Sequence, residues 1–162
     1  MSLPYLAGYP PHLLDQIQTL LQRGELGDWV RRRHPGPHEV QTDRALYDYV
    51  MVRKQRFLKN APAPAKVLYD NQLDLIGGTL GSNTYASRVQ GNRLKRKNEI
   101  RIASLLREAS EPLLEMLVVH ELAHLKVKDH DKAFYQLCCH MLPDYHQLEF
   151  ELRVWLTWRE LG

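Results

Sequence analysis

The apolar and polar positions of the N-terminal third repeat with the period of a helix. Residues 10–23 and residues 44–60 each place apolar side chains three and four positions apart, with polar residues between them. This spacing predicts one amphipathic helix in each segment. Gly24 follows the first segment, and HPGPH at 34–38 interrupts the chain before the second.

The spacing of apolar positions changes from that of a helix to that of a strand after the Pro-rich connector APAPA at residues 61–65. Residues 66–70 and 98–103 are short and rich in side chains that favour strands. Residues 83–92 contain a third candidate strand, which ends in a turn at Gly91-Asn92. These segments predict a small, mostly antiparallel sheet with one or more hairpins.

Helical spacing returns in three segments of the C-terminal third. Ser110 is a candidate N-cap for a helix that extends to about Val127. Asp129 is a candidate N-cap for a second helix that extends to about Met141. The third helix begins near Pro143. Three helices after a run of strands predict an α+β fold.

The chain has the length of one domain. At 162 residues it can bury about 70% of its unfolded surface without disulfides or structural metals. We therefore expect a single domain over residues 1–162, with an N-terminal helical part at 1–60 and a core at 64–162.

The first of these C-terminal helices carries polar residues where apolar ones are expected. Leu113, Leu117, His120 and His124 are spaced four, three and four apart, so they form one stripe on a helix. Glu121 falls on the neighbouring, otherwise apolar stripe. A buried carboxylate without a partner is costly, so this cluster indicates a cation that compensates it.

The spacing of these residues is that of the HExxH motif of zinc hydrolases. Histidines four apart on a helix lie one above the other, close enough to share a Zn²⁺ ion. Glu121 lies about 100° around the helix from His120, so it can stay off the metal and act on a water molecule. About 0.02 such matches are expected in a shuffled sequence of this composition, so the motif predicts one catalytic zinc ion.

A catalytic zinc site needs a third protein ligand beside its open position. His130 lies six residues beyond His124 and can fold back toward the metal if the chain turns at Lys128-Asp129 and Asp129 caps the next helix. His130 is therefore the predicted third ligand. The other candidates lie in the last two predicted helices: His140, His146, Glu149 and Glu151.

This set of residues predicts a metallopeptidase mechanism. A bound zinc ion lowers the pKa of a water molecule toward about 7 and polarises a peptide carbonyl. Glu121 then accepts a proton from the water and passes it to the leaving amine. The candidates for stabilising the oxyanion are Tyr135, Tyr145 and His146, and the sequence does not choose among them.

Charge and composition add a second hypothesis and a compartment. Arg93, Lys95, Arg96 and Lys97 form a basic stretch in a chain of net charge +3, which suits contact with nucleic acid as well as a solvated loop. The adjacent cysteines, Cys138 and Cys139, cannot form a disulfide framework. With no signal peptide and no apolar run of membrane-spanning length, the chain is expected to be cytoplasmic, with no membrane partner.

One stretch of 48 residues resembles a known family. The sequence NEIRIASLLREASEPLLEMLVVHELAHLKVKDHDKAFYQLCCHMLPDY, residues 98–145, is similar to YgjP-like metallopeptidases and, more distantly, to WLM and SprT-like proteases. The resemblance implies a minimal zincin-like domain in which His120, His124 and His130 bind the metal and Glu121 is the catalytic base. It also implies that Phe134 packs behind His130.

The chain departs from that family before the final strand. Family members commonly carry an R-W-G-S-C segment there, whereas residues 79–97 read TLGSNTYASRVQGNRLKRK. The substrate therefore remains open between a peptide or protein and, because SprT-like relatives act on DNA-bound proteins, a nucleic-acid-associated target. A third hypothesis is a zinc-binding module with little turnover.

Overall fold

The structure is a computed structural model that describes residues 3–73 and 99–162. Two short 3-10 helices, η1 (Pro4–Leu6) and η4 (Ser104–Glu108), accompany six α-helices and two strands in this described part. The bounds of the α-helices are α1 (Pro11–Gln22), α2 (Leu26–Arg33), α3 (Asp43–Phe57), α5 (Glu111–Ala123), α6 (Lys132–Met141) and α7 (Tyr145–Leu161). The strands are β1 (Lys66–Asp70) and β2 (Glu99–Ala103). The α+β class predicted from the sequence is confirmed.

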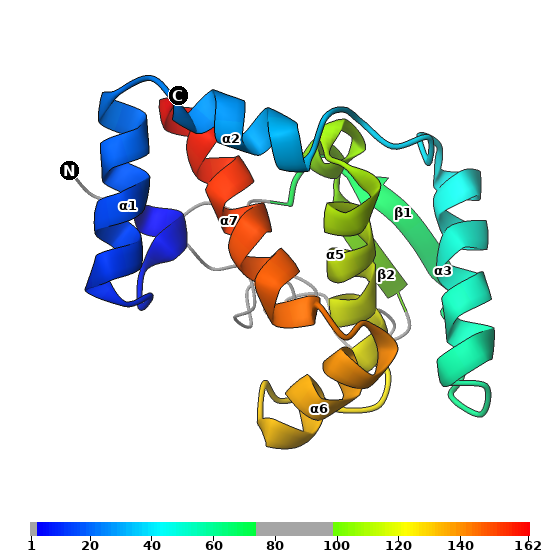
Figure 1. Ribbon diagram of the computed structural model, residues 1–162. Helices are drawn as coiled ribbons and strands as arrows, with labels where there is room; N and C mark the ends of the chain where they lie inside the picture. Colours follow the sequence, from blue (N-terminus) through cyan, green and yellow to red (C-terminus); the bar gives the residue numbers. More distant parts are fainter. Residues whose placement is uncertain (1–2, 74–98) are drawn as a thin grey trace.

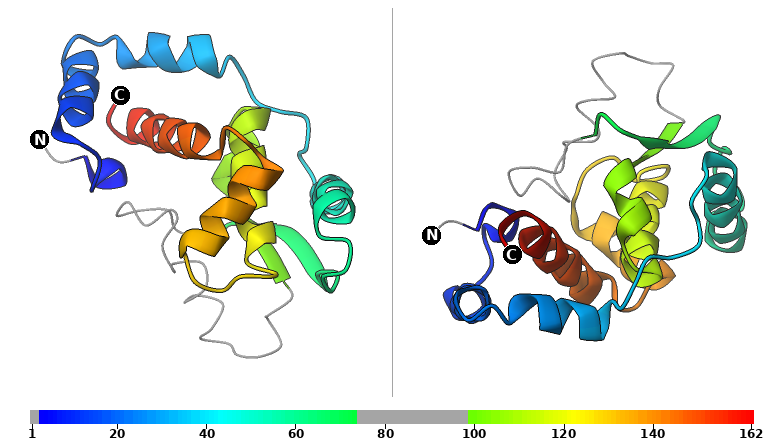
Figure 2. Two further views of the ribbon diagram at one scale, coloured as in Figure 1. Left: turned by 60° about the horizontal axis from the view of Figure 1, so that its bottom comes forward. Right: turned by 90° about the horizontal axis from the view of Figure 1, so that it is seen from above.

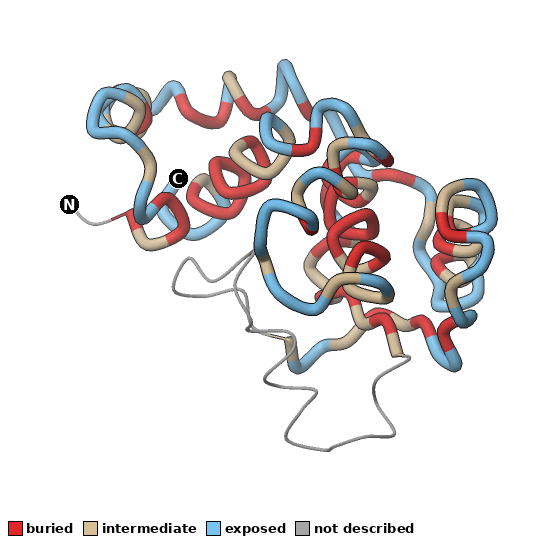
Figure 3. The backbone as a smooth tube through the Cα atoms, turned by 90° about the horizontal axis from the view of Figure 1, so that it is seen from below, coloured by how far each residue is buried: buried red, intermediate tan, exposed pale blue. Residues whose placement is uncertain are grey.

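Helix α5 lies at the centre of the molecule (Figure 1). It packs against β2 on one side and against α7 on the other, while α3 covers β1 and α6 contacts both α5 and α7. The elements η1, α1 and α2 all contact α7 and enclose it, as the two further views show (Figure 2). Buried residues therefore concentrate along α5 and along α7 (Figure 3).

The two strands are parallel, which corrects the antiparallel arrangement expected from the sequence. Val67 pairs with Ile100 and Tyr69 with Ile102, and all four side chains are buried. The physical reason is the connection, since residues 71–98 are long enough for the crossover that parallel strands require. The predicted strand at 83–92 and its turn lie outside the described residues.

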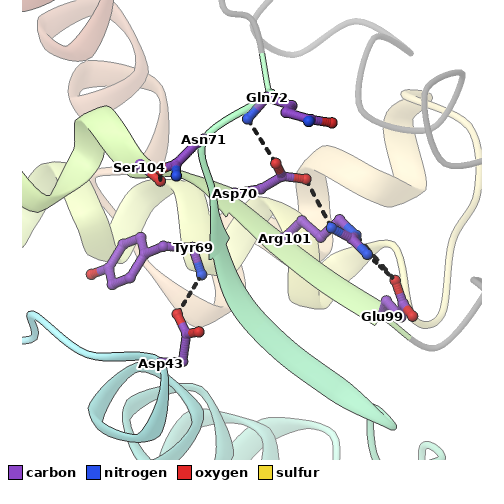
Figure 4. Close-up of polar contacts among 8 residues, drawn as sticks. All are labelled: Asp43, Tyr69, Asp70, Asn71, Gln72, Glu99, Arg101 and Ser104. Atoms are coloured by element: carbon purple, nitrogen blue, oxygen red, sulfur yellow. Dashed lines mark hydrogen bonds and ion pairs between the residues drawn. The ribbon is translucent and has the colours of Figure 1, made fainter.

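Polar side chains tie the strand ends together. The guanidinium of Arg101 on β2 donates to Asp70 at 2.9 Å and to Glu99 at 3.0 Å (Figure 4). The backbone N–H of Tyr69 donates to the carboxylate of Asp43, at the start of α3, at 2.9 Å. The hydroxyl of Ser104 donates to the side-chain carbonyl of Asn71. These bonds fix β1 against both β2 and α3.

Helix boundaries differ from the sequence prediction at both ends of the loop between α5 and α6. Helix α5 ends at Ala123, with His124 as its C-cap, rather than near Val127. Asp131, not Asp129, caps α6, because its carboxylate accepts a hydrogen bond from the backbone N–H of Phe134 at 3.0 Å. The eight-residue helix α2 was not predicted, because it is short and ends in three arginines.

Candidate metal centre

Helix α5 presents its two histidines from the most buried part of the chain. Nine of its thirteen residues are buried, so its position is set by packing on both sides. His120 lies in the last turn and is fully buried. His124 is the C-cap residue, and its Nδ1 lies 3.1 Å from the carbonyl of Val127. Nδ1 of His124 therefore donates its proton to that carbonyl, which leaves a lone pair on Nε2.

The loop after α5 brings a third imidazole to the same point. Nε2 of His130 lies 3.0 Å from Nε2 of His124 and 3.3 Å from Nε2 of His120. Ligands of one tetrahedral zinc ion, each about 2.0–2.1 Å from it, are separated by about 3.3 Å. Within residues 3–73 and 99–162 this is the one group of three metal-ligating side chains in such close contact. The three nitrogens therefore suit a single Zn²⁺ ion.

The surroundings keep these imidazoles neutral. Burial lowers the pKa of His120 well below its usual value, and the neighbouring histidines lower it further. Burial also lowers the pKa of His124 and of His130. Neutral imidazoles with converging lone pairs are the form that a metal ion requires.

Glu121 follows His120 in the last turn of α5 and has an unusual environment. Its Oε2 atom is inaccessible to water and has no hydrogen-bond partner among the described residues. Burial raises the pKa of this carboxyl group to about 8. A buried carboxylate without a protein partner is costly, and a cation with its water would supply the missing one. This orphaned oxygen is a second observation that fits a metal centre.

One aromatic ring packs against all three imidazoles. Phe134 in α6 is fully buried, and its ring centroid lies 5.0, 4.5 and 4.9 Å from those of His120, His124 and His130. Because the Asp131 cap fixes the first turn of α6, it also fixes Phe134 relative to His130. The local sequence D-H-D-K-A-F therefore determines both the third imidazole and its support.

The three candidate oxyanion stabilisers have different positions. The Tyr145 hydroxyl is buried and lies 2.8 Å from Nδ1 of His120, on the ring edge that faces away from the other histidines. The ring centroid of Tyr135 lies 6.4 Å from that of His130, and Tyr135 is half-buried. His146 is mostly exposed and lies 4.0 Å from Glu149. The oxyanion role of all three residues stays a prediction, and of the three only Tyr145 has its hydroxyl within hydrogen-bond distance of His120.

The alternative third ligands lie elsewhere. Both oxygens of Glu151 are occupied, because Arg33 and His34 of the N-terminal part contact them at 2.6 and 2.7 Å. Glu149 lies 4.0 Å from Arg153 as well as from His146, and His140 is exposed with its ring against Phe57. None of these belongs to the histidine group.

Sequence reasoning missed one buried polar network. His34 bonds through Nδ1 to the hydroxyl of Ser110 at 2.6 Å and through Nε2 to Glu151 at 2.7 Å. The hydroxyl of Ser110 therefore makes no N-capping bond to α5. His34 and Glu151 are 117 positions apart, so no local pattern could have joined them. The predicted nucleic-acid contacts, Arg93, Lys95, Arg96 and Lys97, fall outside the described residues.

Comparisons with known proteins agree with a hydrolytic metal centre. The sequence pattern of the family described as YgjP-like, metallopeptidase domain matches residues 88–154. The chain is 55% identical to a UTP pyrophosphatase of Escherichia coli (strain K12) over 161 residues, which cover 99% of this chain and 96% of that protein. No solved structure matches the chain. None of the described helices is long and apolar enough to cross a membrane.

The family and the relative have different substrates in their names but the same reaction class. A metallopeptidase and a pyrophosphatase both split a bond with water, so the chain is an enzyme of the hydrolase class. The match with the relative extends over nearly all of both proteins. The chain therefore belongs to the YgjP-like, metallopeptidase domain family.

Proposed function

We propose that this protein is a metal-dependent hydrolase that converts UTP and water into UMP and pyrophosphate. The observation that carries the proposal is the 55% identity to a UTP pyrophosphatase along nearly the whole of both chains. The aligned 161 residues span the metal centre and the elements that surround it. The hydrolytic site described above supplies the chemistry that the reaction needs.

The roles follow from the positions of the side chains. His120, His124 and His130 hold the ion through Nε2, and the carboxylate of Glu121 takes a proton from the attacking water as general base. When bound, the ion supplies Lewis acidity toward a phosphoryl oxygen and makes water a stronger nucleophile. Attack at the α-phosphorus breaks the bond to the bridging oxygen, which leaves with pyrophosphate.

The charges around the third histidine suit a phosphate-bearing substrate. Lys126, Lys128 and Lys132 are exposed in the segment that carries His130. Asp131 in this segment is engaged as the cap of α6, and the exposed Asp129 is its other carboxylate, so three lysines face two acidic residues. Lysines beside a reacting phosphate compensate its negative charge, whereas a peptide bond is uncharged until water attacks it.

Peptide hydrolysis is the second candidate, as the sequence motif predicted. The HExxH arrangement and the description of the family both favour it. The ion and Glu121 would act on a carbonyl carbon in the same way as on phosphorus. The two candidates therefore differ in the substrate and share the residues.

A direct test uses the zinc-loaded protein with UTP and, separately, with a mixed peptide library. We expect release of UMP and pyrophosphate in equal amounts. Glu121→Gln should lower kcat by about 10²–10⁴-fold, the usual contribution of a general base, while zinc stays bound. Peptide cleavage without UTP hydrolysis would favour the second candidate. Full activity of metal-loaded Glu121→Gln would remove Glu121 from either mechanism.

A further inference from the structure

A buried tyrosine contacts His120 on the side of its ring that faces away from the other two histidines. Tyr145 begins α7, and its side chain, like that of His120, is fully buried. Its hydroxyl oxygen lies 2.8 Å from Nδ1 of His120, the ring nitrogen that does not face the other histidines. The two rings are nearly parallel, with 10° between their planes. The contact therefore joins α7 to the metal centre on α5.

The same hydroxyl has a second partner, on α6. The side chain of Cys138 is fully buried and lies close enough to the Tyr145 hydroxyl that each group shifts the pKa of the other. Burial raises the pKa of the Cys138 thiol to about 12, so the sulfur is uncharged at neutral pH. His120, Cys138 and Tyr145 come from α5, α6 and α7, so their contacts connect the metal centre to the core.

The direction of these bonds determines whether His120 can bind a metal. A neutral imidazole carries one proton, on either Nδ1 or Nε2, and only the nitrogen without the proton can bind an ion. If the Tyr145 hydroxyl donated to Nδ1, the imidazole proton would sit on Nε2, where the metal binds. If Nδ1 donates to the hydroxyl oxygen, Nε2 has a free lone pair.

We propose that Tyr145 and Cys138 act as positioning residues that hold His120 in its metal-binding tautomer. Nδ1–H of His120 donates to the Tyr145 oxygen, and the Tyr145 O–H donates to Sγ of Cys138. Cys138 thereby directs the tyrosine proton away from the histidine. His124 obtains the same tautomer from the carbonyl of Val127. The proposal rests on the metal centre of the proposed function and is independent of its substrate.

The test is zinc affinity, measured by competition with a coloured chelator. We expect Tyr145→Phe to weaken zinc binding by about 10- to 100-fold, the usual effect of removing the partner of a metal-binding histidine. Tyr135→Phe is the matched control, because that tyrosine lies beside His130 and no hydrogen bond joins its hydroxyl to the three histidines. It should keep wild-type affinity. The urea midpoints of the metal-free proteins show whether each variant folds.

Cys138 is tested by two substitutions of opposite effect. Cys138→Val fills the space but cannot accept a hydrogen bond, so it should weaken zinc binding by at least about threefold. Cys138→Ser restores an acceptor and should bind zinc more tightly than Cys138→Val. Cys139→Val, at the half-buried neighbouring thiol, should leave affinity unchanged. With Co²⁺ in place of zinc, Tyr145→Phe should change the visible absorption bands and Cys139→Val should not.

Several outcomes would overturn the proposal. Wild-type zinc affinity in Tyr145→Phe would show that the hydroxyl does not position His120. Equal losses in Tyr145→Phe and Tyr135→Phe would indicate general loosening of the core instead. Equal affinities of Cys138→Val and Cys138→Ser would remove the thiol from the network. A wild-type protein that binds zinc but leaves UTP intact would contradict the proposed function and leave this inference standing.

Discussion

Replacement of His130 by alanine tests the metal centre with little effect on the fold. His130 lies between α5 and α6, in neither helix, and is half-buried. Its polar contacts are the two other imidazoles, and its ring contacts include Phe134. We therefore expect the metal-free His130→Ala protein to unfold within about 1 kcal/mol of the wild type.

The expected loss of zinc affinity follows from the number of ligands. Four-ligand structural zinc sites bind with about 10–16 kcal/mol, which is about 2.5–4 kcal/mol for each ligand. Removal of one nitrogen should therefore weaken binding by about 100- to 1000-fold. With free zinc at 1000 times the wild-type Kd, bound zinc stabilises the wild type by about 4.1 kcal/mol. A site weakened 100- to 1000-fold would gain only about 0.4–1.4 kcal/mol.

Thermal unfolding with and without zinc measures this difference. For a chain of this length each kcal/mol moves Tm by about 2–4 °C. The zinc-dependent rise in Tm should therefore fall from about 8–16 °C in the wild type to about 1–6 °C in His130→Ala. His140→Ala, an exposed histidine on α6, should retain the full rise. If His130→Ala and the wild type gain the same Tm and contain equal zinc by elemental analysis, His130 is not a ligand.

Two further predictions concern stability. Replacement of Glu151 by glutamine should lower the unfolding free energy by about 1.5–3 kcal/mol at pH 7, because His34 and Arg33 then lose the charged acceptor that they contact. Burial raises the pKa of Glu151, but hydrogen bonds from Arg33, Gln147 and His34 outweigh it and lower that pKa below its usual 4.5. The stabilisation is thus complete above about pH 4.5 and lost as the pH falls through the lower folded-state value, so urea titrations of wild type and Glu151→Gln should converge in acid. A constant difference down to pH 3 would show that the ionised carboxylate is not the cause. Phe134→Ala removes a fully buried ring that contacts all three imidazoles, and should lower the unfolding free energy by about 3–5 kcal/mol. Excess zinc should restore part of that loss in the same urea titration, whereas a total loss below about 1 kcal/mol would place the ring outside the core.

The sheet shows where sequence reasoning failed. The composition of residues 66–70 and 98–103 correctly predicted strands, now β1 and β2. It could not give their relative direction, because strand propensity is the same in parallel and antiparallel pairs. Direction depends on how the chain returns between the strands. Helix α2 was missed because it has only eight residues and ends in Arg31, Arg32 and Arg33. So short a segment has too few apolar positions to show helical spacing.

The sequence by itself determined the features of this protein that depend on spacing within one element. His120, Glu121 and His124 are a few residues apart on one helix, so helical geometry alone predicts that the histidines can share an ion. The family could be recognised from the same stretch. A local turn and a cap at Asp131 place His130, although the sequence alone suggested a different cap.

Tertiary structure decided which side chains support those residues. The contacts of Tyr145 with His120 and of Glu151 with His34 join positions 25 and 117 residues apart. Their bonds exist only because α5, α6, α7 and the N-terminal segment pack together. Apolar faces pack together whatever their separation in the sequence. The spacing of residues along the chain therefore does not show which polar groups become buried next to one another. The candidate metal-binding residues could therefore be predicted from the sequence, and the polar contacts that surround them could not.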